Sequence, residues 1–169
     1  AAQEWALTLE PGRTFGILGP GGKWRPQEDS GHFLLIGDAS ALPAIARAVE
    51  ELPRGARAEV FLEVEDPDLR DALPEAPGVE VTWVDPGGAL PGSRLVDVVT
   101  AAHPRTGNTS VFLHGNAEMV RDLRRTLLGE WGLDRSALSA SGYWRHGCTD
   151  EQWRAQKKAF VAAMERDVA

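Results

Sequence analysis

The chain has 169 residues, 43% of them hydrophobic and 25% charged, a composition typical of one globular domain with a sizeable core. A formal net charge of −7 at pH 7 argues against nucleic acid as the main partner, because phosphate backbones bind basic surfaces. No apolar run reaches the roughly 20 residues of a membrane span, and no signal peptide is visible. A single cysteine, Cys148, excludes an internal disulfide and favours a cytoplasmic location.

The beginning of the chain predicts a short antiparallel hairpin. Residues 5–9 and 14–18 have the alternation of two half-buried strands, and Glu10-Pro11-Gly12 between them is a turn sequence. Two such strands ahead of a parallel domain resemble the end of a preceding domain. We therefore expect residues 1–31 to be organised separately from residues 32–169.

The next segment predicts a strand, a tight turn and a helix. The apolar run 33–36 ends at Gly37 and Asp38, and Ser40 stands where a helix N-cap is expected. Pro43 follows in the first turn, where a missing N–H does no harm. Apolar residues then continue at helical spacing: Leu42, Ile45, Val49 and Leu52.

The rest of the chain alternates between strands and helices. Apolar runs predict strands at 58–64, 79–84, 110–113 and 138–141. Three more helices are expected: 95–102 with Ser93 as N-cap, an amphipathic helix capped by Asn116, and a final helix with a capping box of Thr149 and Gln152. This order predicts a three-layer α/β fold with a parallel sheet of about five strands.

Two turns mark the expected ligand-binding edge. Ligands of open parallel sheets bind at the carboxyl ends of the strands, and the turns at 37–40 and 115–117 both fall there. Each turn leads into a helix N-terminus, whose free N–H groups and dipole suit a phosphate. The same residues also fit ordinary strand-to-helix turns and caps, and the pattern alone leaves both interpretations open.

The succession GPGG, LLIGDASALPAI, VEVTWV, GNAEMVRDLRR and GLDRSALSASGYWRHG closely resembles the siderophore-interacting proteins, FAD-dependent ferric-siderophore reductases of the ferredoxin-NADP reductase superfamily. GDASALP and SGYWR are its most specific parts. The resemblance implies that 32–169 is an NAD(P)H-binding domain like the C-terminal domain of that superfamily, and that 1–31 is a remnant of the flavin barrel with its linker. The flavin-binding motif of the barrel is absent from this sequence, so we expect that this chain alone does not hold FAD.

The resemblance also assigns cofactor-binding residues to the two turns. Gly37 would let the backbone approach the cofactor closely, and Ser40 with the N–H groups after it would hold the pyrophosphate. The full set implied is Gly37, Asp38, Ser40, Ala41, Pro43, Asp85, Gly115, Asn116 and Ala117. Relatives commonly carry glycine-glutamate where this chain has Gly115-Asn116.

The carboxyl end of the third strand bears on the choice between NADH and NADPH. Relatives often have a basic residue there, whereas this chain has Asp85 followed by Pro86. A carboxylate at this place would repel a 2′-phosphate and would accept a hydrogen bond from a ribose hydroxyl, which favours NADH. The alternative is that Asp85-Pro86 is only a solvated turn.

Near the end of the resemblance, two aromatic residues and an arginine follow one another. By the resemblance, Tyr143 and Trp144 lie near the flavin edge as catalytic residues, and Arg145 attracts an anionic ferric siderophore. A packed Trp144 beside a solvated Arg145 is the alternative. His146 and Cys148 are metal-ligand types, but two ligands do not make a site, so no metal site is predicted.

These features predict the nicotinamide-binding part of an NAD(P)H-dependent ferric-siderophore reductase, which releases iron from siderophores. The expected partners are a nicotinamide dinucleotide, a ferric siderophore and a flavin-binding domain or chain. Two alternatives remain: a flavoreductase with another electron acceptor, and a stand-alone binding module without catalysis.

Overall fold

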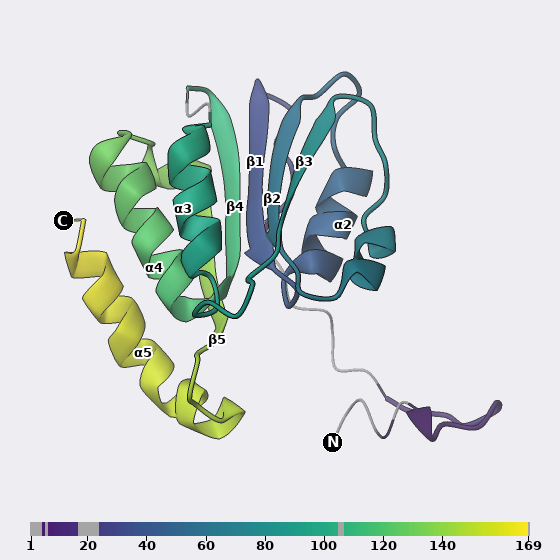
Figure 1. Ribbon diagram of the computed structural model, residues 1–169. Helices are drawn as coiled ribbons and strands as arrows, with labels where there is room; N and C mark the ends of the chain where they lie inside the picture. Colours follow the sequence, from purple (N-terminus) through teal and green to yellow (C-terminus); the bar gives the residue numbers. More distant parts are fainter. Residues whose placement is uncertain (1–4, 6, 17–23, 105–106, 169) are drawn as a thin grey trace.

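The centre of the protein is a sheet of five parallel strands in the order β3-β2-β1-β4-β5 (Figure 1). The computed structural model describes residues 5, 7–16, 24–104 and 107–168. The strands are β1 (His32–Asp38), β2 (Ala58–Glu63), β3 (Val79–Val84), β4 (Thr109–Asn116) and β5 (Leu138–Trp144). Because all neighbouring pairs are parallel, the carboxyl ends of all five strands share one edge, the lower one in Figure 1.

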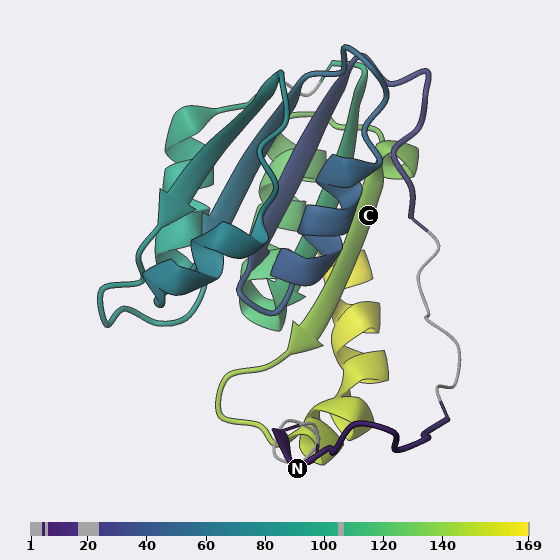
Figure 2. The ribbon, with the colours of Figure 1, turned by 90° about the vertical axis from the view of Figure 1, so that its right-hand side faces the viewer.

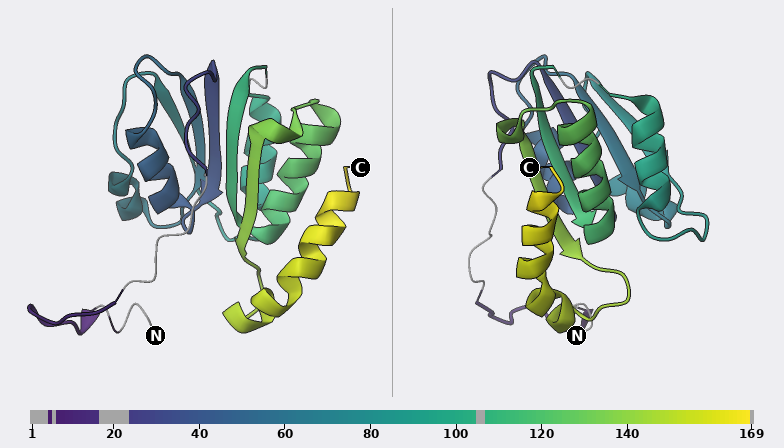
Figure 3. Two further views of the ribbon diagram at one scale, coloured as in Figure 1. Left: turned by 180° about the vertical axis from the view of Figure 1, so that it is seen from behind. Right: turned by 90° about the vertical axis from the view of Figure 1, so that its left-hand side faces the viewer.

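Helices cover both faces of this sheet, as Figures 1 and 2 show. One face carries α2 (Leu42–Glu50) and the 3₁₀ helix η1 (Pro67–Ala72), and the other carries α3 (Ser93–Ala102) and α4 (Ala117–Arg125). A π turn, η2 (Thr126–Glu130), continues α4, and the 3₁₀ turn η3 (Arg135–Ala137) leads into β5. The last helix, α5 (Asp150–Arg166), lies outside α4 and β5 (Figure 3). The predicted three-layer α/β fold is confirmed.

The core consists of two apolar layers separated by the sheet. Successive side chains of β1 point to opposite faces, so Leu34 and Ile36 pack with α3 and α4, whereas Phe33 and Leu35 pack with α2. All four are fully buried. A strand that is apolar on both faces belongs in the middle of a parallel sheet, and this explains the uninterrupted apolar run in the sequence.

Two of the predicted helix caps are wrong, and two are confirmed. The N-cap of α2 is Ala41, because the Ser40 hydroxyl donates to Asp38 instead. The N-cap of α3 is Gly92, and Ser93 is the first residue of the helix. Asn116 caps α4, and the Thr149–Gln152 capping box starts α5, both as predicted. At α3 the Glu63 side chain from the end of β2 takes the capping role, whereas no side chain caps α2.

The predicted N-terminal hairpin is also wrong over residues 5 and 7–16, where no strand forms. The Thr8 N–H turns back to the Trp5 carbonyl at 3.2 Å, and the Trp5 and Phe15 rings meet edge-on with centroids 5.4 Å apart. This local clustering replaces the expected extended pairing. Residues 17 and 18 of the second predicted strand lie outside the described residues.

The segment just before β1 packs on the α/β fold. The Trp24 ring lies 5.1 Å from the Phe112 ring, Arg25 pairs with Glu51 at 3.4 Å, and the Gly31 N–H donates to the Asn108 carbonyl at 3.0 Å. Among the described residues, no helix is both long and apolar enough to cross a membrane.

Candidate functional site

Asp38 lies at the centre of the carboxyl edge of the sheet and joins three segments. Its Oδ1 accepts hydrogen bonds from the Ser40 N–H at 2.9 Å and the Ser40 hydroxyl at 2.5 Å. Its Oδ2 accepts from the Asn116 N–H at 2.7 Å and from Trp144 Nε1 at 2.8 Å. The residue is only 6% exposed. The chain leaves β1 toward β2 on one side and returns as β4 on the other, so Asp38 bridges the topological switch point where such folds bind ligands.

Two glycines permit this close approach. A Cβ on Gly115, whose φ is +136°, would lie 2.7 Å from the Asp38 carboxylate. A Cβ on Gly37 would lie 2.6 Å from the Ala41 Cβ and 2.8 Å from the His114 carbonyl oxygen. Both glycines therefore serve the packing of the chain against itself at this edge.

The other small residues predicted at the two turns also have packing roles. Ala41 is fully buried, and its N–H donates to the Asp38 carbonyl at 2.9 Å. Ala117 is fully buried, and its Cβ lies 3.0 Å from where a Cβ on Gly142 would be. Pro43 is exposed in the first turn of α2.

Beside Asp38 lies a cavity of about 470 Å³, which we call the Trp144 hollow. Its walls include Trp144 on one side and Pro86 and Pro91, from the loop between β3 and α3, on the other. Three carboxylates also line it: Asp38, Glu63 and Glu65. Apolar walls with carboxylate acceptors suit a flat ring that carries hydrogen-bond donors or a positive charge.

Glu63, at the end of β2, is a feature that the sequence analysis missed. Its Oε1 accepts from the Gly92 N–H at 2.6 Å and its Oε2 from the Leu95 N–H at 3.3 Å, so it caps α3 from 29 and 32 positions away. Burial raises the pKa of this carboxyl, and the nearby Asp38 charge acts in the same direction, while the two N–H groups oppose it. A charged residue inside the apolar run 58–64 was the available signal.

A second cavity, of about 380 Å³, adjoins the first at Pro91 and lies between the N-termini of α3 and α4. We call it the Asn116 hollow. Apolar and polar side chains line it together: Leu90, Val96, Met119, Ser93, Asn116, Glu118, Asp122 and His146. The Asn116 Oδ1 accepts from the N–H groups of Glu118 and Met119 at 3.0 and 3.1 Å, which caps α4.

Asp85 forms a turn in the structure. Its Oδ1 accepts the Gly87 N–H at 2.8 Å, and the side chain is exposed. The Arg94 guanidinium lies against the same turn, with a nitrogen 2.5 Å from where a Cβ on Gly87 would be. Asp85 is not among the residues that line either hollow.

Tyr143 and Trp144 face different surroundings, as adjacent strand residues should. Trp144 reaches Asp38, whereas the Tyr143 hydroxyl lies 3.0 Å from His114 Nδ1 on the face that carries α2. His114 Nε2 lies 3.0 Å from the Ser139 hydroxyl, and its ring stacks on Phe112. Burial, assisted by the Lys157 charge, lowers the pKa of His114 to about 4. The structure therefore separates Tyr143 from the Trp144 hollow.

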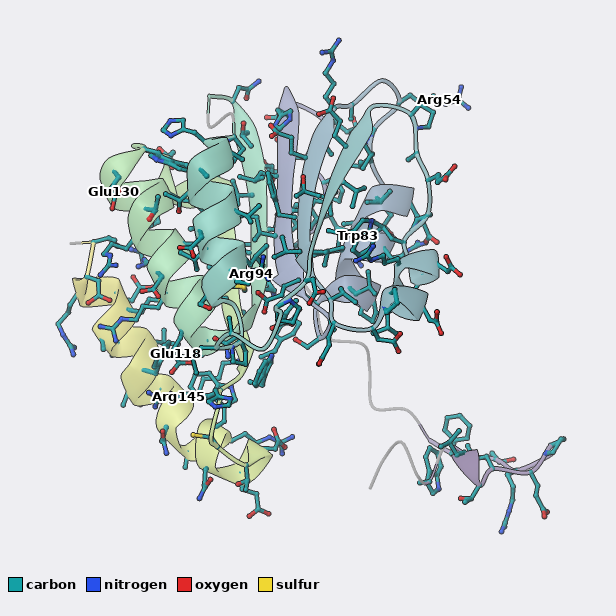
Figure 4. The ribbon with its side chains drawn as sticks, viewed as in Figure 1. Arg54, Trp83, Arg94, Glu118, Glu130 and Arg145 are labelled. Carbon is teal, nitrogen blue, oxygen red and sulfur yellow. The ribbon has the colours of Figure 1, made fainter. Side chains whose placement is uncertain are left out.

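Arg145 is held by neighbouring helices at the lower end of the molecule (Figure 4). Its Nε donates to Glu118 Oε1 at 2.6 Å, and its Nη1 donates to Gln156 at 3.0 Å. The guanidinium also lies over the Phe160 ring at 5.3 Å. Among the described residues, no three His, Cys, Asp or Glu side chains come together as a metal site.

The nicotinamide dinucleotide implied by the fold family has rings and phosphates to place at this edge. The Trp144 hollow offers a ring the surfaces of Trp144 and the loop prolines, with carboxylates that can accept from a carboxamide or a ribose. Phosphates gain less at the starts of α3 and α4, because Glu63 and Asn116 already bind N–H groups there, whereas no side chain caps the start of α2.

Comparison with known proteins agrees with this architecture. The family model for siderophore-interacting proteins matches residues 30–147. The Mycobacterium tuberculosis protein Rv2895c is 39% identical over 96% of the chain, and the ferric vibriobactin reductase ViuB of Vibrio cholerae is 29% identical over 93%. The chain spans 61% and 59% of the lengths of these two relatives.

A solved structure shows the same fold. The crystal structure of a siderophore utilization protein from T. fusca superposes with a TM-score of 0.70 at 36% identity, over 89% of this chain and 58% of that one. With the family match covering more than half of its length, the chain belongs to the siderophore-interacting protein family.

Proposed function

We propose that this chain is the nicotinamide-dinucleotide-binding part of a ferric-siderophore reductase that acts in the cytoplasm. The observation that carries the proposal is the Trp144 hollow, which lies at the carboxyl ends of β1 and β2 beside the switch point of the sheet. ViuB, a relative by sequence, is named as a ferric vibriobactin reductase, which supports the same activity class.

The residues of the hollow have distinct roles in this proposal. Trp144, whose indole is held by Asp38, and the loop prolines hold the nicotinamide ring and exclude water from it. The carboxylates of Asp38 and Glu63 bring negative charge to this edge, which favours the positively charged oxidised ring over the neutral reduced one. The bound nicotinamide supplies the hydride.

The acceptor side of the reaction involves Arg145. Its guanidinium would attract an anionic ferric siderophore, and its bonds to Glu118 and Gln156 would keep it in place. Reduction of the metal weakens its match to hard oxygen ligands, so iron is released. FAD, as the carrier between nicotinamide and iron, is assigned to a flavin-binding domain or chain, and another electron acceptor is the alternative substrate.

A stand-alone binding module without catalysis is the second candidate. The observation that favours it is that the chain's own Glu63 and Asn116 occupy the N-termini of α3 and α4, which leaves little there for a pyrophosphate. The two candidates differ in whether the chain binds a nicotinamide dinucleotide at all.

Isothermal titration with NADH and NADPH tests the proposal on the chain itself. We expect saturable binding that weakens about tenfold in Trp144→Phe, because the smaller ring loses the Nε1 bond to Asp38 and part of the wall. Trp83→Phe is a matched change on β3, the outer strand on the other side of the sheet from β5 (Figure 4), and it should leave the affinity unchanged because Trp83 does not line the hollow. Absence of binding by both nucleotides would favour the binding module.

A further inference from the structure

The outer strand β3 has one edge that no other strand covers within the described part of the chain. Figure 2 shows β3 at one margin of the sheet, where it pairs with β2 alone. The Val64 N–H donates to the Val84 carbonyl at 3.0 Å, so Val84 faces β2. Because backbone groups alternate along a strand, Val79, Val81 and Trp83 turn their N–H and C=O groups to the uncovered edge. Such a row is a template for pairing with another strand.

The same three residues give this edge an apolar row. Their side chains share the face of the sheet that carries α2, and they line a cavity of about 840 Å³ that we call the β3 groove. Val79 and Trp83 are half-buried against the core on that face, whereas Val81 between them is 37% exposed. The wall opposite β3 is formed by the end of η1 and the residues after it, up to Ala76. The groove is therefore open beside an unpaired backbone edge.

Charged side chains of both signs line the β3 groove. The Arg70 guanidinium lies over the Trp83 ring at 5.6 Å, and its Nε is buried without a hydrogen-bond partner among the described residues. Asp71 and Glu75 line the groove as well. None of these three charged residues makes an ion pair within the described part of the chain. A surface that carries both an unpaired cation and unpaired carboxylates is complementary to a second copy of itself across a two-fold axis.

One antiparallel register suits such a pairing best. Centred on Val81, it sets Val81 against Val81 of the second copy and Val79 against Trp83, and each pair exchanges both backbone hydrogen bonds. Centring it on Glu80 would oppose two carboxylates, which is destabilising. Centring it one residue after Val81 would pair Val79 with Asp85, which lies outside β3. The register centred on Val81 therefore uses all three outward residues within the strand.

We infer that two copies of this chain form a symmetric dimer through the uncovered edges of β3, with Val81 at the two-fold axis and the two sheets joined into one. The dimer pairs the free backbone groups and covers the apolar row. It also brings Arg70 of each copy beside a groove that carries Asp71 and Glu75. The inference goes beyond the proposed function, because the outward residues of β3 do not line the Trp144 hollow.

Sedimentation equilibrium of the full chain over a range of concentrations tests the inference. We expect a reversible monomer–dimer equilibrium. Val81→Lys should weaken it at least about tenfold, because two like charges then meet at the axis. Leu7→Lys, at a position that is 80% exposed in the N-terminal segment, should leave it unchanged. A chain that stays monomeric up to about 1 mM overturns the inference, as does a dimer that dissociates in Leu7→Lys and persists in Val81→Lys.

A charge pair at the axis tests the symmetry. Val81→Lys and Val81→Glu should each be mainly monomeric at a concentration where the wild type is dimeric. An equimolar mixture of the two variants should form a dimer again, because opposite charges then face each other. Since Val81 is exposed, neither variant should change the thermal midpoint of the monomer by more than a few degrees. A mixture that stays monomeric overturns the placement of Val81 at the axis.

Cysteine crosslinking checks the register without altering charge. In a Cys148→Ser background, Val81→Cys places two thiols about 5.5 Å apart by their Cα atoms, which suits a disulfide. Thr82→Cys is the matched control, since Thr82 is also exposed but lies diagonally from its copy at about 7–8 Å. We expect a mild oxidant to crosslink Val81→Cys into a covalent dimer and to leave Thr82→Cys monomeric on a denaturing gel. Crosslinking in Thr82→Cys alone, or in neither variant, overturns the inference.

Discussion

Asp38 is the residue on which the geometry of the carboxyl edge depends most. Four donors from the β1–α2 turn, the β4–α4 turn and β5 converge on its two oxygens. The cluster is held by hydrogen bonds to a carboxylate, which are stronger than those between neutral groups. Asp38 therefore sets the position of Trp144 and of the start of α4 together.

Asp38→Asn should destabilise the fold by about 2–4 kcal/mol, because an amide keeps one acceptor oxygen and turns its NH₂ group toward two of the four donors. Urea unfolding at neutral pH measures the change. Asp85→Asn is the matched control, since that exposed side chain keeps the Oδ1 that accepts the Gly87 N–H, and its effect should stay within about 0.5 kcal/mol. Similar effects for both variants would contradict the central role of Asp38.

His114 should make stability depend on pH. The folded pKa of His114, about 4, lies below its ordinary value of 6.5, so the unfolded chain takes up a proton first as the pH falls. Stability from this group is therefore full above pH 6.5 and is lost as the pH falls toward 4, by about 2–3 kcal/mol.

The comparison of wild type with His114→Phe isolates this dependence. The variant keeps the stacking on Phe112 but cannot titrate. Its free energy of unfolding should change less between pH 7 and pH 4.5 than that of the wild type. Glu63 titrates in both proteins and cancels in the difference. Parallel pH curves would show that His114 is freely protonated in the fold.

At the scale of elements, the sheet was predictable and its long-range caps were not. The apolar runs predicted β3 with its exact bounds and the other strands to within a few residues. Ser93 looked like the N-cap of α3 because a local pattern contains no information on Glu63, which lies at the end of β2 and caps that helix instead. Asp38 and Asn116 were marked by their turns and Trp144 by the resemblance, yet the hydrogen bonds among them span up to 106 positions and depend on the strand order.

The capping of α3 by Glu63 leads to a prediction for that helix. Glu63→Leu keeps the bulk at the end of β2 but leaves the buried N–H groups of Gly92 and Leu95 unpaired, which should cost about 2–3 kcal/mol. Hydrogen exchange should speed up at these two amides more than at those of α4. Glu65→Leu, an exposed position two residues on, should leave this exchange unchanged. Unchanged exchange in Glu63→Leu would show that α3 does not depend on this cap.

At the scale of the whole molecule, the structure bears on where the α/β domain begins. The sequence predicted a boundary after residue 31, at the start of β1. The contacts of Trp24, Arg25 and Gly31 with Phe112, Glu51 and Asn108 attach the preceding residues to the domain. In contrast, Trp5, Leu7 and Phe15 are 49%, 80% and 52% exposed, and Figure 1 shows their segment to the side of the α/β fold. Strand periodicity carries no information on a packed tryptophan, so the position of the domain boundary stays a prediction.

Two truncations locate the boundary. Removal of residues 1–22 should leave the thermal midpoint within about 1 °C, because the described residues it removes are largely exposed. Removal of residues 1–31 should lower it by about 5 °C, since it takes away the Trp24 packing together with the Arg25 pair and the Gly31 bond. Trp24→Ala in the full chain should reproduce most of that loss. Differential scanning calorimetry measures all three, and an equal loss in both truncations would move the boundary to before residue 22.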